Sequence, residues 1–339
     1  DNNAFKADDY EELRPRSPFY LFRPKAAGNE HYLKWTKVPE IFPVNSVGIV
    51  TARDKLTIQD SPNKVRTIIR NFTSMDVETA REAYKLGKDV VGWKVENAQN
   101  DLKDSGLDDN NIIPILYRLF DKRYTYYTGK STGFHCRPRK EVMRHMLGEN
   151  VAIIAVRQVK SGNTWQHVSV SNMISESCYI SNKTSEISYV FPLYLYPDEH
   201  NEDIFANSKR EYNIAPEFID HFSKLWTEFK PEQLFYYTYA VLHSNEYRRR
   251  FKQCLSLDFP RIPFTDDYDI FSNLANYGKE LADIHLLQSS KLNPPLAKYQ
   301  GSGSNDTVEF IRYNKKKGIV QINPDKYFEG ITPELWNYQ

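Results

Sequence analysis

The sequence has few of the residues that build metal centres and disulfide frameworks. Its three cysteines, Cys136, Cys178 and Cys254, are far apart in 339 residues. They form neither a CxxC pair nor a Cys/His spacing typical of zinc, and an odd, scattered set predicts no disulfide framework. The eight histidines are scattered as well, without an HxxxH or HxH pair. This cysteine usage is typical of a reducing, cytoplasmic compartment.

Long apolar runs and net charge are also missing. No run approaches the roughly 18 apolar residues of a membrane span, so we expect no membrane partner. The formal net charge is +1, which excludes a uniformly basic or acidic protein. With 40% apolar and 26% charged residues the chain can bury a core, and its 339 residues predict two or three units.

Catalytic motifs are absent or incomplete. Gly129-Lys130-Ser131 resembles the end of a phosphate-binding P-loop, but Tyr124 stands where the first glycine of that loop is needed. No Gly-x-Ser-x-Gly nucleophile elbow is present. Asn293-Pro294-Pro295 resembles the Asn-Pro-Pro-aromatic motif of amino-methyltransferases, yet Leu296 replaces the ring that would stack on a base. We expect no catalytic residue, metal site or cofactor in this chain.

Positive charge is concentrated in one segment. Between Arg118 and Arg144 there are eight Lys or Arg and two acids, Asp121 and Glu141, a local balance of +6. Tyrosines are interleaved with these cations. Cations neutralise phosphates while rings pack on sugars or bases, so the pattern favours nucleic acid. Arginine can also read guanine in the major groove, whereas lysine mainly holds phosphate.

We therefore predict a set of DNA-contacting residues centred on this segment. Arg157, Trp165 and His167 are included because they follow it closely and are predicted to face outward. The candidates are Arg118, Lys122, Arg123, Tyr124, Tyr126, Lys130, His135, Arg137, Arg139, Lys140, Arg144, Arg157, Trp165 and His167. The alternative is that acids elsewhere pair with these cations, since the chain has 44 Asp and Glu.

The apolar pattern predicts a mixed α+β fold with a central, largely antiparallel sheet flanked by helical subdomains. Residues 1–60 contain prolines and short apolar runs, which predict extended strands and connectors and not helices. The run 151–159 is almost continuously apolar and typical of a buried strand. The expected recognition unit, 61–290, divides into a helical part (61–107), a basic loop with the sheet (108–200) and a second helical part (213–290). Residues 291–339 are expected to form a C-terminal loop and hairpin of the same unit.

An ordered series of segments resembles the C-terminal specificity region of type ISP restriction–modification enzymes. The segments are Asp89–Leu102, Tyr117–Gly129, Arg137–Met146, Arg157–Gln158, Phe191–Pro197, Tyr239–Ser244, Asp258–Pro263, Leu281–Leu287 and Tyr327–Trp336. The resemblance spans roughly residues 10–339. The ordered series is far more specific than any single motif in it.

The resemblance implies a function in a larger enzyme. Type ISP enzymes are single-chain bacterial proteins that join a nuclease, an ATP-driven translocase, an adenine methyltransferase and a target-recognition domain. This chain would recognise double-stranded DNA, and residues 1–60 would be a linker or trailing strands of the upstream methyltransferase. S-adenosylmethionine, ATP and Mg are expected in the other domains of the parent polypeptide, in the bacterial cytoplasm. Two alternatives stay open: a divergent adenine methyltransferase built around Asn293, and a scaffold whose basic segment docks an acidic protein.

Overall fold

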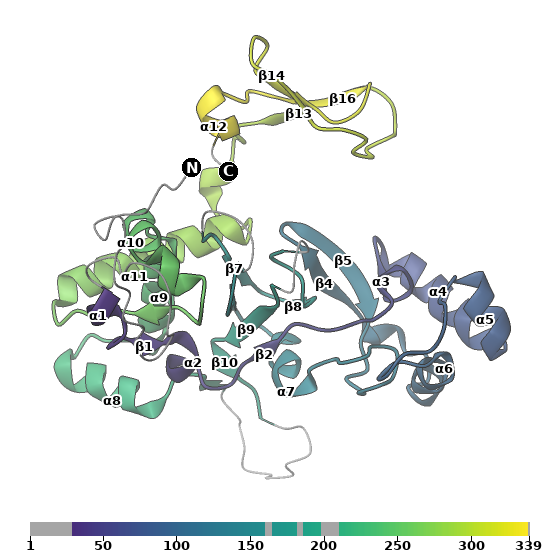
Figure 1. Ribbon diagram of the computed structural model, residues 1–339, viewed down its shortest axis with the longest axis horizontal. Coiled ribbons are helices and arrows are strands. Elements are labelled where there is room, and N and C mark those ends of the chain that lie inside the picture. The colour runs from purple at the N-terminus through teal and green to yellow at the C-terminus, as the bar shows by residue number, and fades with distance from the viewer. Residues whose placement is uncertain (1–28, 160–164, 182–185, 198–209, 338–339) are drawn as a thin grey trace, which may run out of the picture. The chain divides into compact units, whose positions relative to one another are not determined.

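The protein divides into two compact units, one extending to Ala282 and a small one of residues 283–339. A computed structural model (Figure 1) describes residues 29–159, 165–181, 186–197 and 210–337. The mixed α+β class predicted from the sequence is confirmed, since helices and several antiparallel sheets alternate along the chain.

Three helices form one end of the first unit. Two of them begin at side-chain caps: the Ser61 hydroxyl accepts from Lys64 N, and the Asp76 carboxylate accepts from the backbone of Glu78 and Thr79. Their apolar faces pack around the fully buried Trp93. The helices are α4 (Pro62–Ser74), α5 (Val77–Ala83) and α6 (Val95–Asp104). They confirm the helical structure predicted between residues 61 and 107.

Two four-stranded sheets replace the single central sheet expected from the sequence. The first, in the order β3-β5-β4-β8, contains β3 (Ile58–Gln59), β4 (Ile112–Arg118), β5 (Asp121–Tyr126) and β8 (Ile174–Ser175). The second, in the order β2-β9-β6-β7, contains β2 (Ser46–Val47), β6 (Ala152–Val156), β7 (Val168–Ser171) and β9 (Ser188–Pro192). All pairs are antiparallel except β4 with β8. Every residue of β6 is buried, as its apolar run predicts.

The described part of residues 1–60 differs from the expected linker. It contains short helices α1 (Asn29–Tyr32), α2 (Val38–Ile41) and α3 (Asp54–Thr57), which the sequence reading did not predict. β2 pairs with β9, and β3 pairs with β5, so this stretch is built into both sheets. The reason is that its short apolar runs bury residues such as Phe42 and Ile49 completely. Residues 1–28 lie outside the described part of the chain.

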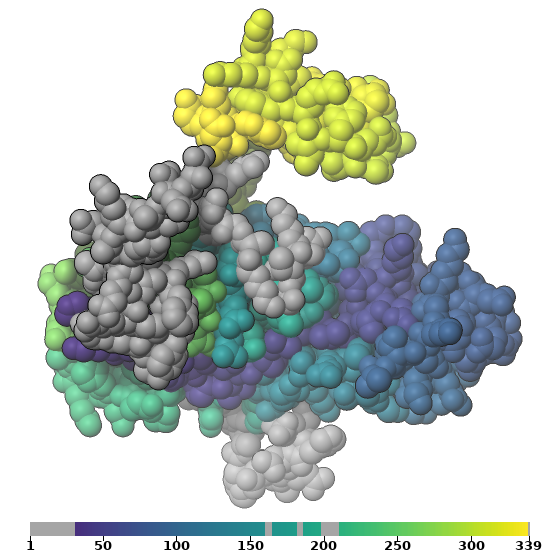
Figure 2. All heavy atoms as spheres, viewed as in Figure 1, coloured from purple at the N-terminus to yellow at the C-terminus, as the bar shows by residue number. Residues whose placement is uncertain are grey.

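Helices form the other end of the first unit. They are α8 (Pro216–Leu225), α9 (Pro231–His243), α10 (Asn245–Leu255) and α11 (Tyr268–His285). α9 ends before Ser244, whose hydroxyl accepts from Tyr247 N and begins α10. Figure 1 shows these helices at one end and α4–α6 at the other, with the sheets between; in Figure 2 the atoms of the α4–α6 end are blue. Short pairs β1 (Thr36–Lys37) with β12 (Arg261–Ile262), and β10 (Tyr194–Leu195) with β11 (Glu211–Tyr212), tie this end to the rest.

The second unit is a small antiparallel sheet that is compact by itself. Its strands, in the order β13-β16-β15-β14, are β13 (Lys298–Gly301), β14 (Arg312–Asn314), β15 (Ile319–Gln321) and β16 (Lys326–Glu329), followed by α12 (Pro333–Asn337). The predicted terminal hairpin is confirmed as β14–β15. None of the described helices is long and apolar enough to cross a membrane.

Candidate nucleic-acid interface

The basic segment is half strand and half loop. Its first part is the β4–β5 hairpin, in which Arg118 lies opposite Asp121. Leu119 and Phe120 therefore form the tip of this hairpin. After β5 the chain makes a loop, pairs briefly with Val50 at Arg137, and enters α7 (Lys140–Met143) and a 3₁₀ turn (Arg144–Met146). The expected basic loop thus begins only after Tyr126.

Several predicted cations have carboxylate partners, as the alternative reading anticipated. Arg118 Nη1 lies 2.6 Å from Glu176 Oε2, a carboxylate that is only 6% exposed. The other three pairs are exposed at one or both side chains: Arg123–Asp121 at 2.8 Å, Lys130–Asp104 at 3.0 Å and Arg157–Asp258 at 3.3 Å. Exposed ion pairs contribute little stability, so phosphate can replace the acid in these three. Arg118 is instead a structural residue of the hairpin.

Three predicted contact residues are core residues, and their prediction is corrected. Tyr126 is fully buried and shares a 2.8 Å hydrogen bond with Ser105 Oγ. His135 is 1% exposed, and its burial lowers the pKa of the imidazole to about 4, so the ring is neutral at pH 7. Trp165 is 3% exposed. A buried side chain cannot contact DNA without moving, so none of the three belongs to the surface.

His167 does not stand on an outward strand face as predicted. His167 lies before β7, which begins only at Val168. The imidazole Nε2 of His167 lies 3.3 Å from Glu186 Oε2. Burial lowers the pKa of this imidazole, and the glutamate counteracts that effect.

Arg144 also has a structural contact. Its Nη1 donates to the backbone carbonyls of Tyr196 and Pro197, at 2.9 and 3.1 Å. Lys122 and Tyr124 lie on β5, where the Lys122 ammonium is 5.9 Å from the centre of the Tyr124 ring. Lys122 is exposed and has no ion pair with any residue that the structure describes.

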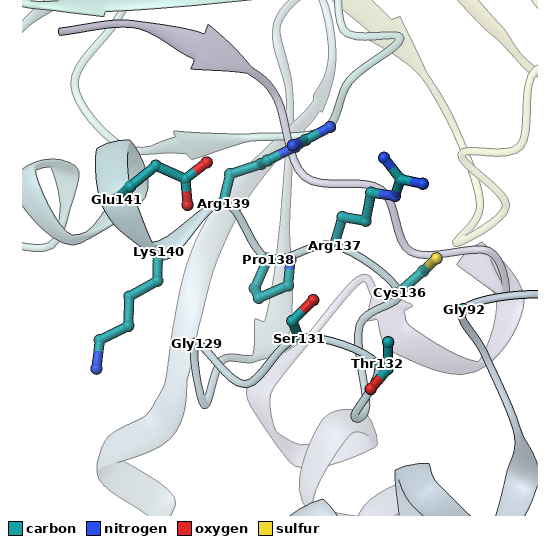
Figure 3. A pocket seen from close by; sticks show the side chains of 10 residues that line it. All are labelled: Gly92, Gly129, Ser131, Thr132, Cys136, Arg137, Pro138, Arg139, Lys140 and Glu141. Carbon is teal, nitrogen blue, oxygen red and sulfur yellow. The ribbon is translucent and has the colours of Figure 1, made fainter.

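Arg137, Arg139 and Lys140 are the predicted cations that lie together without acid partners. None of them forms an ion pair within the described part of the chain. They line a cavity of about 400 Å³ together with Ser131 and Thr132. Figure 3 shows the Arg137 and Arg139 side chains pointing the same way, while Lys140 points away from them. The Nε of Arg139 is buried and has no hydrogen-bond partner among the described residues.

The backbone of Arg139 explains this divergence. Its φ of +56° is left-handed, which turns the chain sharply before α7. Its carbonyl accepts from Val142 N and Met143 N, so Arg139 also begins the helix. Neighbouring cations consequently project in different directions from one short stretch.

A buried carboxylate shapes the loop that carries these cations. Asp101, on α6, is 2% exposed and accepts from Thr128 Oγ1 at 2.9 Å and from Phe134 N at 2.7 Å. Trp93 Nε1 adds a 3.1 Å hydrogen bond to the Phe134 carbonyl. The sequence reading missed Asp101. Its signal was a carboxylate on the helical face that also carries Ala98, an apolar face where an acid needs partners.

The hairpin tip and Arg137 lie at the same end of an extended sheet. Glu176, just after β8, donates its backbone N–H to Leu116, and Ile49 pairs with Glu176 on the other side. Val50 and Arg137 then exchange two backbone hydrogen bonds, of 3.0 and 2.9 Å. Three strand spacings, or about 14 Å, therefore separate β4 from Arg137 in this row. An apolar tip and unpaired cations thus share one edge of the fold.

A family model for the Type ISP C-terminal specificity domain matches residues 40–339. The chain belongs to this family. The resemblance seen in the sequence is confirmed. No curated protein sequence matches the chain.

Three solved structures share the fold. The first is a DrdV–DNA complex, with a TM-score of 0.66 and 21% identity, covering 99% of this chain and 35% of that chain. The second is a nuclease-deletion mutant of the Type ISP enzyme LlaGI in complex with a DNA substrate mimic, with a TM-score of 0.64 and 19% identity, covering 98% of this chain and 30% of that chain. The third is the ATP-dependent Type ISP enzyme LlaBIII bound to DNA, with a TM-score of 0.67 and 18% identity, covering 98% of this chain and 22% of that chain. At these identities the likeness shows the fold. This chain spans about a third or less of their length. No group of three or more His, Cys, Asp or Glu in the described residues could hold a metal ion.

Proposed function

We propose that this chain reads the DNA sequence for a restriction–modification enzyme. The observation that carries the proposal is the cavity lined by Arg137, Arg139 and Lys140, cations that have no acid partner among the described residues. Arg137 and Lys140 are exposed and Arg139 is half-buried, so their charged groups can take a phosphate or base acceptor. Membership of a specificity-domain family supports the same function. The three fold relatives are described as bound to DNA or to a DNA mimic, which supports it further.

The residues of this surface would make different contacts with DNA. An arginine fork can hold two acceptors of guanine or of one phosphate, so Arg137 and Arg139 are suited to either contact. Lys140, pointing elsewhere, would hold a more distant phosphate as a point charge. The hydroxyls of Ser131 and Thr132 can donate to phosphate oxygens between them. The exposed pairs of Arg123, Lys130 and Arg157 would exchange their acids for phosphates at the margins.

The chemistry of the parent enzyme would lie in other domains. The chain would direct adenine-N6 methylation and ATP-dependent translocation and cleavage, with S-adenosylmethionine, ATP and Mg bound by those domains in the cytoplasm. The rival methyltransferase reading is poorly supported, because Asn293 and Leu296 are exposed in the loop before β13. Calorimetry of this chain with S-adenosylmethionine should therefore show no binding heat; a saturable heat would revive that reading.

Fluorescence anisotropy with a labelled duplex tests the proposal. The double variant Arg137→Ala/Arg139→Ala should bind at least about tenfold more weakly than the wild type at low salt. The control is Arg249→Ala/Arg250→Ala, which removes the same charge from exposed positions on α10 and should bind like the wild type. Equal affinity of all three proteins would contradict the proposed site.

Salt dependence separates DNA binding from the docking of an acidic protein. Each phosphate contact releases counterions, so the logarithm of the affinity should fall linearly with the logarithm of the salt concentration. Losing two phosphate contacts should lower that slope by about two. A duplex affinity that does not change with salt would contradict the proposed phosphate contacts.

A further inference from the structure

The tip of the β4–β5 hairpin exposes two large apolar side chains. Phe120 is 63% exposed and Leu119 is 45% exposed. Arg118 pairs with Asp121, so the two apolar residues fill the whole turn between the strands. Turn positions at the surface usually carry Gly, Asn, Asp or Ser.

The backbone makes this choice of residue more unfavourable. Phe120 has a φ of +59°, the left-handed region that Gly and Asn adopt readily. A bulky aromatic residue there is uncommon and is worth explaining by function. A glycine at this position would remove both the backbone strain and the exposed ring. Together with the exposed Leu119 beside it, the strained and exposed ring points to a contact with a partner.

The hairpin is fixed firmly behind its tip. The Arg118–Glu176 ion pair joins β4 to the residue after β8. Tyr117 OH donates to Asp54 Oδ2 at 2.9 Å. The guanidinium groups of Arg118 and Arg123 lie 3.9 and 4.4 Å from the centre of the Tyr117 ring. A rigid support of this kind lets a tip push into a partner without folding back.

Positive charge surrounds the tip. Lys122 follows it by two residues and has no ion pair among the described residues. Arg137 lies at the same end of the extended sheet, about 14 Å from β4 by strand spacing. An apolar projection between cations matches a duplex, whose phosphates flank stacked apolar bases. It does not match an apolar protein surface, against which the cations would lose their hydration.

We propose that Leu119 and Phe120 insert as an apolar wedge between adjacent base pairs of bound DNA. Side chains of this kind unstack a base step and bend the duplex in other DNA-binding proteins. Phe120 stacks on a base, Leu119 packs beside it, and Lys122 and Arg137 hold phosphates on the two sides. This inference rests on the proposed DNA-binding function and adds to it a contact that lies outside the cavity.

The test compares Phe120→Gly with the wild-type chain by anisotropy over a range of salt concentrations. Stacking of one ring on a base predicts about tenfold weaker binding with an unchanged salt slope, because no phosphate contact is lost. Urea unfolding of Phe120→Gly should show stability equal to or above that of the wild type, since glycine adopts the left-handed backbone freely. Phe120→Trp should retain the affinity.

Leu287→Ala provides the matched control. Leu287 is 64% exposed and has a φ of +59°. The Leu287→Ala variant should bind DNA with the affinity of the wild type. Wild-type affinity of Phe120→Gly, together with weak binding by Arg137→Ala/Arg139→Ala, would overturn the wedge and leave the proposed function intact. Absence of duplex binding by the wild-type chain would overturn both.

Discussion

Gly133 packs directly against Asp101: a Cβ placed on the glycine would lie 2.2 Å from the Oδ2 of the aspartate. That oxygen accepts from Thr128 Oγ1 and from Phe134 N, so it closes the loop on both sides of the glycine. The loop leads to Arg137 and Arg139. The position of the unpaired cations therefore depends on a buried carboxylate and on the absence of a side chain at residue 133.

Gly133→Ala should destabilise the protein and weaken DNA binding together. The added methyl group must displace the Asp101 carboxylate, which breaks hydrogen bonds to a buried charged group at a cost of about 1–3 kcal/mol. Urea unfolding and duplex anisotropy measure the two effects. Gly148→Ala is the control, because its Cβ would be 3.1 Å from the end of the Tyr196 side chain, which can move. Equal stability of Gly133→Ala and the wild type would show that Asp101 does not hold the loop.

Arg118→Ala should reduce stability without changing the salt slope of DNA binding. Removing the guanidinium leaves the Glu176 carboxylate buried without its cation, and because Arg118 is 26% exposed we expect a cost of about 2 kcal/mol, less than for a fully buried pair. Adding Glu176→Gln to Arg118→Ala should recover part of the loss, as measured by a double-mutant cycle. A lower salt slope for Arg118→Ala would instead make this arginine a phosphate contact.

The stability of the protein should fall between pH 6.5 and 4 partly because of His135. Burial lowers the pKa of this imidazole to about 4, and its Nδ1 has no hydrogen-bond partner among the described residues. The unfolded chain takes up a proton near pH 6.5, whereas the folded chain does so only near pH 4. The depressed pKa thus costs up to about 3 kcal/mol as the pH falls through this window.

Urea unfolding at a series of pH values measures this effect. Between pH 6.5 and 4, His135→Gln should take up about one proton fewer on unfolding than the wild type. Its free energy of unfolding should therefore change less steeply with pH. Above pH 7 the two proteins should show parallel dependence. The same pH dependence for both proteins between pH 6.5 and 4 would show that folding does not lower the pKa of His135.

The elements of the fold followed from sequence patterns more closely than the site did. The apolar pattern marked the helical part that contains α4, α5 and α6, and a continuous apolar run marked β6. Tyr126, His135 and Trp165 were misplaced because aromatic and histidine side chains occur both in cores and on binding surfaces. The partners of Arg118 and Arg157 are 58 and 101 residues away, so no local pattern could show which cations are paired.

The hairpin tip is a second feature that the sequence did not mark, here a contact that was missed. Leu119 and Phe120 look like ordinary apolar residues between Arg118 and Asp121 in the sequence. Only the register of β4 with β5 places them in a turn, and only the backbone angle shows that Phe120 is strained there. Tertiary structure thus changed the assignment of the contacts within a segment that composition had located.

Selection from a pool of random duplexes tests the central claim, that this chain reads DNA sequence, most directly. The wild-type chain is incubated with the pool, bound duplexes are recovered and sequenced, and the cycle is repeated alongside Arg137→Ala/Arg139→Ala. The account predicts that the wild-type chain enriches one defined sequence and that the variant loses or relaxes preference at particular positions. A bound pool that stays random, or identical enrichment by both proteins, would contradict it.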